Sequence, residues 1–211
     1  SNPTMHIDHK AGEKMYVDYA GEKLFYLDVF TGELVEAEVF VAILGASQLT
    51  YVEASSSQQK EDFISSCENA LHFFGGVPKA IVTDNLKSAV IKSSKYEPTL
   101  NQAFADFVSH YTMAALPAGP YKPTHKALVE GAVKIIYRTI YPEVKKQVYA
   151  GQESLNRAIH KALEGHNNRL LNARPYSRRQ LFEDIERDQL QGLPQTRFEI
   201  KRRKVVTVMK N

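Results

Sequence analysis

Several features are scarce in this sequence, and each scarcity excludes a class of protein. Its 211 residues include one cysteine, Cys67, so no internal disulfide can form. Cys67 lies among apolar residues at helical spacing, and we expect it in the core rather than at a reactive site. No Cys/His cluster has the spacing of a zinc site, so structural zinc is not expected.

Long apolar runs are missing as well. No stretch is long enough to cross a bilayer, and the first residues lack the basic and apolar regions of a signal peptide. We therefore predict a cytoplasmic protein without membrane contacts. The apolar fraction of 43% is still ample for a core, and a globular chain is expected.

Charge is nearly balanced overall but unevenly distributed. The net charge is +3, yet residues 169–211 contain eleven Lys/Arg and five Asp/Glu, a net +6 that leaves −3 on the remainder. A basic C-terminal region would attract a polyanion such as nucleic acid, but a solvated charged terminus has the same composition. Both interpretations stay open at this point.

Patterns typical of β-strands dominate the first third of the chain. Strands are predicted at residues 15–20, 24–30, 34–44 and 50–54, with tight turns at 21–23 and 31–33. The first three strands would form an antiparallel meander. A helix at 58–74, a strand at 79–83, a helix at 99–110 and a strand at 111–116 follow. Because helices flank the strand at 79–83, it should pair in parallel beside the meander and make the sheet mixed.

The second half is predicted to be mainly helical. Prolines and glycine between 117 and 123 indicate a loop, after which Thr124 is the expected N-cap of a long helix to about residue 141. The remaining predicted elements are a helix at 152–170, a short helix opened by the capping-box spacing of Ser177 to Gln180, and a strand at 197–209. The expected organisation is a linker at 1–14, an α/β core at 15–170 and a helical, basic extension at 171–211.

Three acidic residues stand out by their positions. Asp18 occupies the middle of a strand pattern, where aspartate is disfavoured, and Asp84 ends an apolar strand, where open α/β sheets place ligand sites. Glu130 lies near the start of the long helix, on the side opposite its apolar stripe. Each also has an ordinary interpretation: an exposed edge, a turn before Asn85, and ion pairs with Lys126 or Lys134.

Together the three acids predict a metal site, because the sheet and the helix would bring them to one place. Oxygen-only ligation suits Mg²⁺ or Mn²⁺, and two ions would serve opposite ends of an in-line displacement at phosphorus. Without metal the carboxylates would repel one another, so the site should be mobile or contain at least one acid with a raised pKa.

The segments that contain these acids resemble a known family. VDYAG at 17–21, DNLKSAV at 84–90 and KALVE at 126–130 are similar to the catalytic blocks of DDE transposases and retroviral integrases. SRRQLF at 177–182 and LQGLP at 190–194 extend a narrower resemblance to the IstA-type transposases of bacterial insertion-sequence family twenty-one. The resemblance implies an RNase H-like fold, with Asp18, Asp84 and Glu130 as the metal-binding triad.

The resemblance also implies an activity and partners. Members nick transposon ends, and the freed 3′-hydroxyl then attacks target DNA. They act as multimers, cooperate with an AAA+ ATPase of the IstB type and would be nucleoid-associated when bound to DNA. Relatives carry helix-turn-helix domains ahead of this core, and recognition of transposon ends is expected to belong there. Ala127 replaces a glycine that is frequent in relatives, and no loss of activity is expected because alanine favours helix.

Basic residues near the acids and in the last segment are candidate DNA contacts. Those near the acids could hold phosphates beside the metals: Lys87, Lys122, Lys126 and Lys134. Those in the last segment could contact the DNA backbone without sequence preference: Arg174, Arg178, Arg179, Lys201, Arg202, Arg203 and Lys204. All could instead be solvated surface residues. Asn85 could orient substrate or shape its turn.

Three functions remain under consideration. The leading one is the catalytic core of a DNA transposase. A nuclease of the RNase H type would use the same acids but hydrolyse DNA without joining it. A noncatalytic DNA-binding or assembly module would retain its output when the three acids are neutralised. Joining assays and acid-to-amide variants separate the three.

Overall fold

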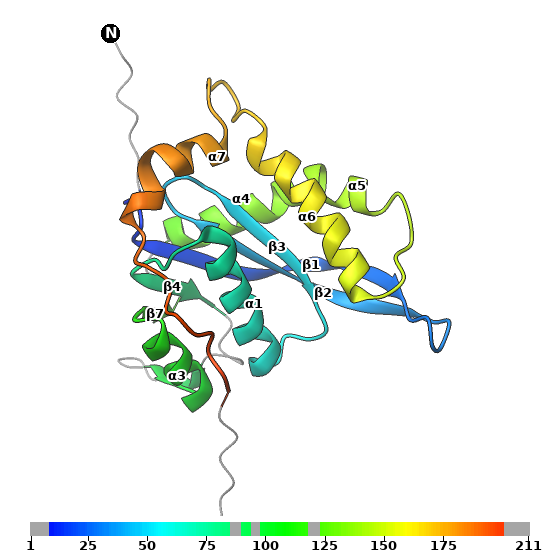
Figure 1. Cartoon of the computed structure of the whole chain (residues 1–211), viewed down its shortest axis with the longest axis horizontal. Helices are drawn as coiled ribbons and strands as arrows, with labels where there is room; N and C mark the ends of the chain where they lie inside the picture. Colours follow the sequence, from blue (N-terminus) through cyan, green and yellow to red (C-terminus); the bar gives the residue numbers. More distant parts are fainter. Residues whose placement is uncertain (1–8, 85–89, 94–97, 118–122, 201–211) are drawn as a thin grey trace, which may run out of the picture.

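The computed structural model describes residues 9–84, 90–93, 98–117 and 123–200, and a five-stranded sheet lies at its centre (Figure 1). The strands are β1 (Lys14–Leu27), β2 (Leu34–Leu44), β3 (Thr50–Ser55), β4 (Ala80–Thr83) and β7 (Ala114–Pro117), in the order β3-β2-β1-β4-β7. The first three are antiparallel neighbours, whereas β4 and β7 pair in parallel. The predicted mixed sheet is confirmed. Strands β5 (Val90–Ser93) and β6 (Pro98–Leu100) form a separate antiparallel pair.

Helices cover both faces of the sheet. They are α1 (Lys60–Phe74), α3 (Gln102–His110), α4 (Pro123–Thr139), α5 (Tyr141–Val144), α6 (Gln152–Asn168) and α7 (Arg178–Leu181), followed by a π turn (Phe182–Glu186) and a 3₁₀ turn (Arg187–Gln189). Figure 1 shows α1 in front of the sheet and α4 behind it. In the part of the chain that the structure describes, no helix is both long and apolar enough to cross a bilayer.

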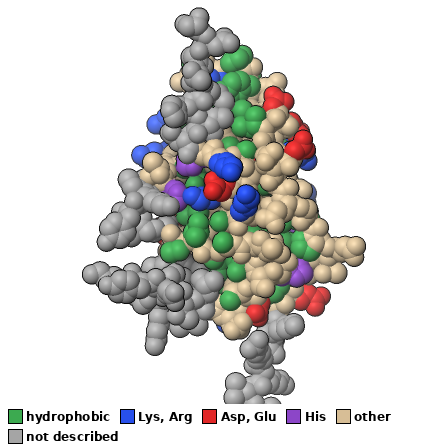
Figure 2. Space-filling view, turned by 90° about the vertical axis from the view of Figure 1, so that its left-hand side faces the viewer, with side chains coloured by type: hydrophobic (Ala, Val, Ile, Leu, Met, Phe, Trp, Pro, Cys, Tyr) green, Lys and Arg blue, Asp and Glu red, His purple; other side chains and the backbone are tan. Residues whose placement is uncertain are grey.

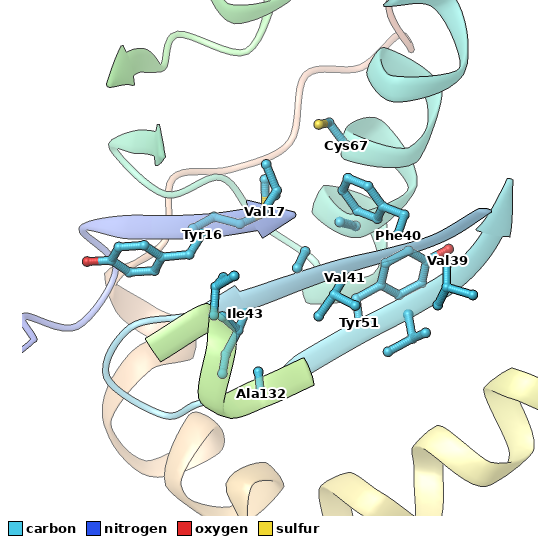
Figure 3. Packing of buried hydrophobic residues seen from close by; sticks show 14 of the residues in the cluster. Tyr16, Val17, Val39, Phe40, Val41, Ile43, Tyr51, Cys67 and Ala132 are labelled. Carbon is cyan, nitrogen blue, oxygen red and sulfur yellow. The ribbon is translucent and has the colours of Figure 1, made fainter. Parts of the chain in front are cut away.

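The core lies between these helices and the central strands. Cys67 of α1 lies on one side of β2, and Ala132 of α4 lies on the other (Figure 3). Phe40 and Phe63 meet edge to face, with ring centroids 6.2 Å apart. Burial raises the pKa of the Cys67 thiol well above its usual value, and the prediction that Cys67 is a core residue is confirmed.

The predicted turn at 21–23 is wrong, because β1 is one continuous strand. Ala20 pairs with Val39 and Leu24 with Ala37, so β1 advances by four residues while β2 advances by two. The extra residues form a bulge that α4 and α5 hold at Glu22. The Glu22 N–H donates to the Tyr137 hydroxyl (3.0 Å), and the Tyr141 hydroxyl donates to the Glu22 carbonyl (2.5 Å). The meander is therefore β1, β2 and β3.

Several predicted helix ends also change. Helix α4 begins at Pro123, so Thr124 lies inside its first turn and is not the N-cap. Ile140 separates α4 from α5, and Pro142 lies in the first turn of α5, where a missing N–H costs nothing. The capping box at Ser177 is confirmed. The described part of the strand predicted at 197–209, residues 197–200, is not a strand, and the rest lies outside the described residues, as do residues 118–122 of the predicted loop.

Helix α6 lies along the outer edge of β3. The Asn156 side chain accepts from the Ala54 N–H (2.6 Å) and donates to its carbonyl (3.0 Å). Asn167 does the same for Thr50, at 3.1 and 2.8 Å. Between them, His160 hydrogen-bonds to the backbone of Val52. Side chains of one helix thus satisfy the backbone groups that β3 turns away from β2.

The described part of the predicted extension packs against the core. The Glu186 carboxylate is fully buried and accepts from the N–H groups of Gly12 (2.9 Å) and Ser47 (3.0 Å). Val77 and Gln191 exchange two backbone hydrogen bonds of 2.8 Å. At Gly12, which has φ +72°, a Cβ would lie 2.4 Å from the Gln189 carbonyl oxygen, so a side chain cannot fit there. The division of the chain at residue 170 stays a prediction.

Candidate active site

Two of the three predicted acids meet where β1 and β4 stop pairing. The parallel register runs from Lys14 opposite Ala80 to Val17 opposite Thr83, so the next residues, Asp18 and Asp84, lie side by side. Their carboxyl groups hydrogen-bond to each other. The position at the carboxyl end of β4 is the one that the strand pattern predicts, and the antiparallel partner of Asp18 is Val41 on β2.

The electrostatic setting of Asp18 favours a positive ligand. Burial is the largest cause that raises the pKa of Asp18 to about 6; the negative charges of Asp84 and Glu130 raise it further. The Tyr19 N–H, which donates to Asp18 Oδ1 at 2.8 Å, opposes these effects. The direction agrees with the expectation for acids that repel one another without a counter-ion.

Glu130 extends from α4 above this pair. Its neighbour Val129 faces the sheet, whereas the Glu130 side chain is 52% exposed and lies 3.7 Å from Lys126 Nζ. This is the ordinary i,i+4 ion pair that the sequence also allowed. Among the described residues, no three Asp, Glu, His or Cys side chains are close enough together to hold an ion. The acids share a neighbourhood, but Glu130 is paired with Lys126 and does not complete a three-residue group with Asp18 and Asp84.

The pocket at the acid pair contains a residue that the sequence analysis missed. Its polar lining residues are Asp18, Asp84, Thr83, Tyr16, Lys126 and His125. His125 Nε2 lies 3.5 Å from Lys14 Nζ, and its ring meets the Tyr16 ring edge to face at 5.3 Å. The alternation of β1 could have placed Lys14 on the face of Asp18, because residues four apart in a strand share a face. No local signal singled out His125.

The candidate DNA contacts fall into different settings. Lys134 is exposed on α4, one turn after Glu130, and Lys126 is engaged with Glu130. Arg178 is only 7% exposed, which argues against contact with a surface phosphate, and Arg179 stacks over the Phe182 ring at 5.7 Å. Arg174 is exposed. Asn85, Lys87, Lys122, Lys201, Arg202, Arg203 and Lys204 lie outside the described residues. Figure 2 shows acidic side chains close to lysine or arginine and histidine on one face of the molecule.

The donor set suits a hard divalent cation. Carboxylate oxygens are the ligands that Mg²⁺ and Mn²⁺ prefer, and the described pocket contributes no thiol to compete. Asp18 and Asp84 are already adjacent, and their mutual repulsion with Glu130 is the charge imbalance that a cation would correct. The residues present therefore fit the predicted ion.

The chain is similar to curated proteins from several bacteria, although it matches no established family profile. It is 46% identical over 191 residues to “Putative transposase y4bL/y4kJ/y4tB” of Sinorhizobium fredii, a match that covers 90% of the chain and 37% of the relative. It is 39% identical over 197 residues to “Putative transposase for insertion sequence IS1162” of Pseudomonas fluorescens, covering 93% and 35%. A weaker match, 27% over 115 residues, is to “Transposase for insertion sequence element IS21” of Pseudomonas aeruginosa, covering 54% and 30%. The matches thus span between 30% and 37% of the length of these relatives.

Solved structures with the same fold come from retroviruses. The chain matches the simian T-cell lymphotropic virus intasome with a TM-score of 0.60 at 20% identity, covering 99% of this chain and 64% of that one. It matches the HTLV-2 integrase catalytic core domain, solved with magnesium, with a TM-score of 0.54 at 19% identity, covering 82% and 97%. The chain has the RNase H-like fold of integrase catalytic cores, and the predicted fold class is confirmed.

Proposed function

We propose that the chain is the catalytic core of an insertion-sequence DNA transposase, which frees a 3′ end of the element and joins it to target DNA. The observation that carries the proposal is the adjacency of Asp18 and Asp84 at the end of two parallel strands, with Glu130 within electrostatic range. The printed names of the relatives support a transposase, and the fold supports a polynucleotidyl transferase.

In this proposal, Asp18 and Asp84 hold the cation from the sheet, and Glu130 completes the set from α4 after it releases Lys126. When bound, Mg²⁺ or Mn²⁺ supplies activation of the attacking oxygen and neutralisation of charge on the leaving oxygen. Two ions are proposed because an in-line displacement has two such oxygens.

The chain's own residues orient the substrate. The strand backbone fixes Asp18 and Asp84 before DNA arrives, so little reorganisation is needed at the reacting phosphate. Lys126, once released by Glu130, is free to pair with a phosphate at the rim of the pocket. The bulge at Glu22 seats α4 on β1 through Tyr137 and thereby fixes the helix that carries Glu130.

The finer assignment is an IstA-type enzyme that acts as a homo-oligomer with an AAA+ ATPase of the IstB type. The motif resemblance and the distant match to the IS21 transposase support it. Transposon ends and target DNA are the proposed nucleic-acid partners, and the bacterial nucleoid is the proposed place of action.

A joining assay tests the proposal. The chain is incubated with Mg²⁺ or Mn²⁺, a labelled duplex that has a free 3′-hydroxyl end, and a circular target. Joined product is expected, and its loss in Glu130→Gln but not in the matched exposed-acid control Glu164→Gln would support the role of the triad. Hydrolysis of DNA without any joining would favour the nuclease instead. DNA binding without joining or cleavage, unchanged in Glu130→Gln, would favour the noncatalytic module.

A further inference from the structure

Lys14 and His125 form a basic pair next to the pocket of the acids: His125 lines that pocket, and Lys14 contacts His125. The Lys14 ammonium lies 3.5 Å from His125 Nε2, and no acidic side chain of the described residues is within ion-pair distance of Lys14. Among the described residues, Lys14 thus meets a neutralisable imidazole and no carboxylate. Its positive charge could attract an anion that approaches beside the pocket.

The two groups are held in place from two elements. Lys14, Tyr16 and Asp18 are two residues apart along β1 and therefore share one face of the strand. At ~3.3 Å per residue, Lys14 lies about 13 Å from Asp18 along the strand. His125 comes from the first turns of α4 and lines the same pocket as Asp18. Tyr16 also contacts this pair of residues. Its ring meets the His125 ring, and its hydroxyl lies 3.2 Å from His9 Nδ1.

We propose that Lys14 and His125 bind a backbone phosphate of the same DNA strand whose reacting phosphate lies at Asp18 and Asp84. This inference rests on the proposed function. Lys14 would supply the charge. In the structure His125 Nε2 accepts from Lys14, so His125 would become an N–H donor to the phosphate once Lys14 turns to the phosphate and the neutral ring carries its proton at Nε2. The acids would thus hold the cation, and the basic pair beside their pocket would set the register of the strand.

A purely structural role is the competing explanation, since the same contact ties α4 to β1. The two explanations differ in salt dependence. Loss of one phosphate contact should reduce the slope of log K against log salt by about one, whereas loss of a structural tie should lower stability without changing that slope.

The test uses the whole chain, Mg²⁺ and a duplex ending in a 3′-dideoxynucleotide, so that binding is measured without joining. Fluorescence anisotropy is recorded from about 50 to 200 mM salt, the range over which phosphate contacts have large effects. Lys14→Met is expected to weaken binding by about fivefold to tenfold and to reduce the slope by about one. Lys14→Arg should restore both. Lys161→Met, at an exposed lysine of α6, is the matched control and should change neither.

His125 is tested by coupling. His125→Ala should weaken binding without changing the slope, and the double variant with Lys14→Met should weaken binding by less than the product of the single effects, because both side chains would serve one phosphate. Melting curves accompany every variant, and Lys14→Gln replaces Lys14→Met if the latter does not fold. A wild-type slope in both Lys14 variants overturns the proposal.

The outcomes separate this inference from the proposed function. If wild type binds DNA but never joins it, while Lys14→Met lowers the slope, the phosphate site stands and the transposase proposal falls. If wild type joins DNA and Lys14→Met binds with an unchanged slope, the phosphate site falls and the transposase proposal stands.

Discussion

Two groups of buried or half-buried carboxylates in this molecule have opposite surroundings. Glu186 is fully buried, and each of its oxygens accepts from a backbone N–H. Asp18 receives one backbone N–H but faces the negative charges of Asp84 and Glu130. Fixed backbone donors thus give each oxygen of the first carboxylate a hydrogen bond. The second has excess negative charge that a bound cation would compensate.

The comparison teaches how a structural acid differs from a functional one. A structural acid contributes to stability, because its removal leaves buried donors without a partner. A functional acid at a repulsive site costs stability until its ligand binds. Substitutions at the two places should therefore move stability and activity in different directions.

The largest effect is expected for Asp18→Asn and Asp84→Asn. Each should reduce strand transfer at least ~100-fold, because metal activation contributes several kcal/mol to the lowering of the barrier. Stability should stay the same or increase, since one repelling charge is gone. Joining rates and melting temperatures measure the two effects. A variant that loses activity only because it unfolds would contradict the comparison.

The next effect is expected for Glu186→Ala. Its removal leaves the buried N–H groups of Gly12 and Ser47 without acceptors, and the free energy of unfolding should fall by about 3–5 kcal/mol. Glu186→Gln retains one acceptor oxygen and should lose less. Denaturant unfolding measures both, with the exposed Glu164→Ala as control. If Glu186→Ala unfolds like wild type, the buried carboxylate is not the structural acid described here.

Metal should stabilise the acid pair in solution. Mg²⁺ at ten times its dissociation constant would add about 1.4 kcal/mol to the free energy of unfolding. Asp18→Asn should abolish this increase, whereas Glu186→Gln should retain it. A melting temperature that does not respond to Mg²⁺ or Mn²⁺ in the wild type would count against a site at Asp18.

The smallest effect is expected for a buried base, His166, which changes how the free energy of unfolding depends on pH. Burial, with the nearby charges of Arg178 and Arg169, lowers the pKa of His166 to about 3. The unfolded chain binds this proton near pH 6.5, so the stability contributed by neutral His166 is complete above about pH 6.5 and falls as pH decreases towards 3. The raised pKa of Asp18 has the opposite effect. Protonated Asp18 contributes stability at low pH, and this contribution is lost as pH rises through about 6.

His166 is therefore tested in an Asp18→Asn background. Unfolding free energies at pH 7.5, 6.5 and 5.5 should fall with pH, and His166→Gln should flatten this decrease. An identical pH dependence in both proteins would show that His166 does not carry it.

Much of the fold follows from the sequence because its patterns are local. The alternation in 34–44 and the helical spacing in 58–74 predict β2 and α1 closely. The turn predicted at 21–23 fails because the bulge depends on Tyr137 and Tyr141, which lie more than a hundred residues away. No local pattern contains such a contact.

The site shows the same limit. Asp84 at the end of a strand was predictable, since strand ends are local features. The role of Glu186 was not, because it lies in a charged segment whose other acids are exposed, and its donors come from Gly12 and Ser47. His125 was missed for a similar reason: its contact with Lys14 exists only after α4 packs on β1.

The row of side chains that α6 presents to β3 limits how copies of this chain can associate. With Asn156, His160 and Asn167 occupying the backbone groups of Ala54, Val52 and Thr50, this border offers no template to an incoming strand. Growth of the sheet from one molecule into the next is closed off there. Self-association would have to use surfaces elsewhere on the molecule.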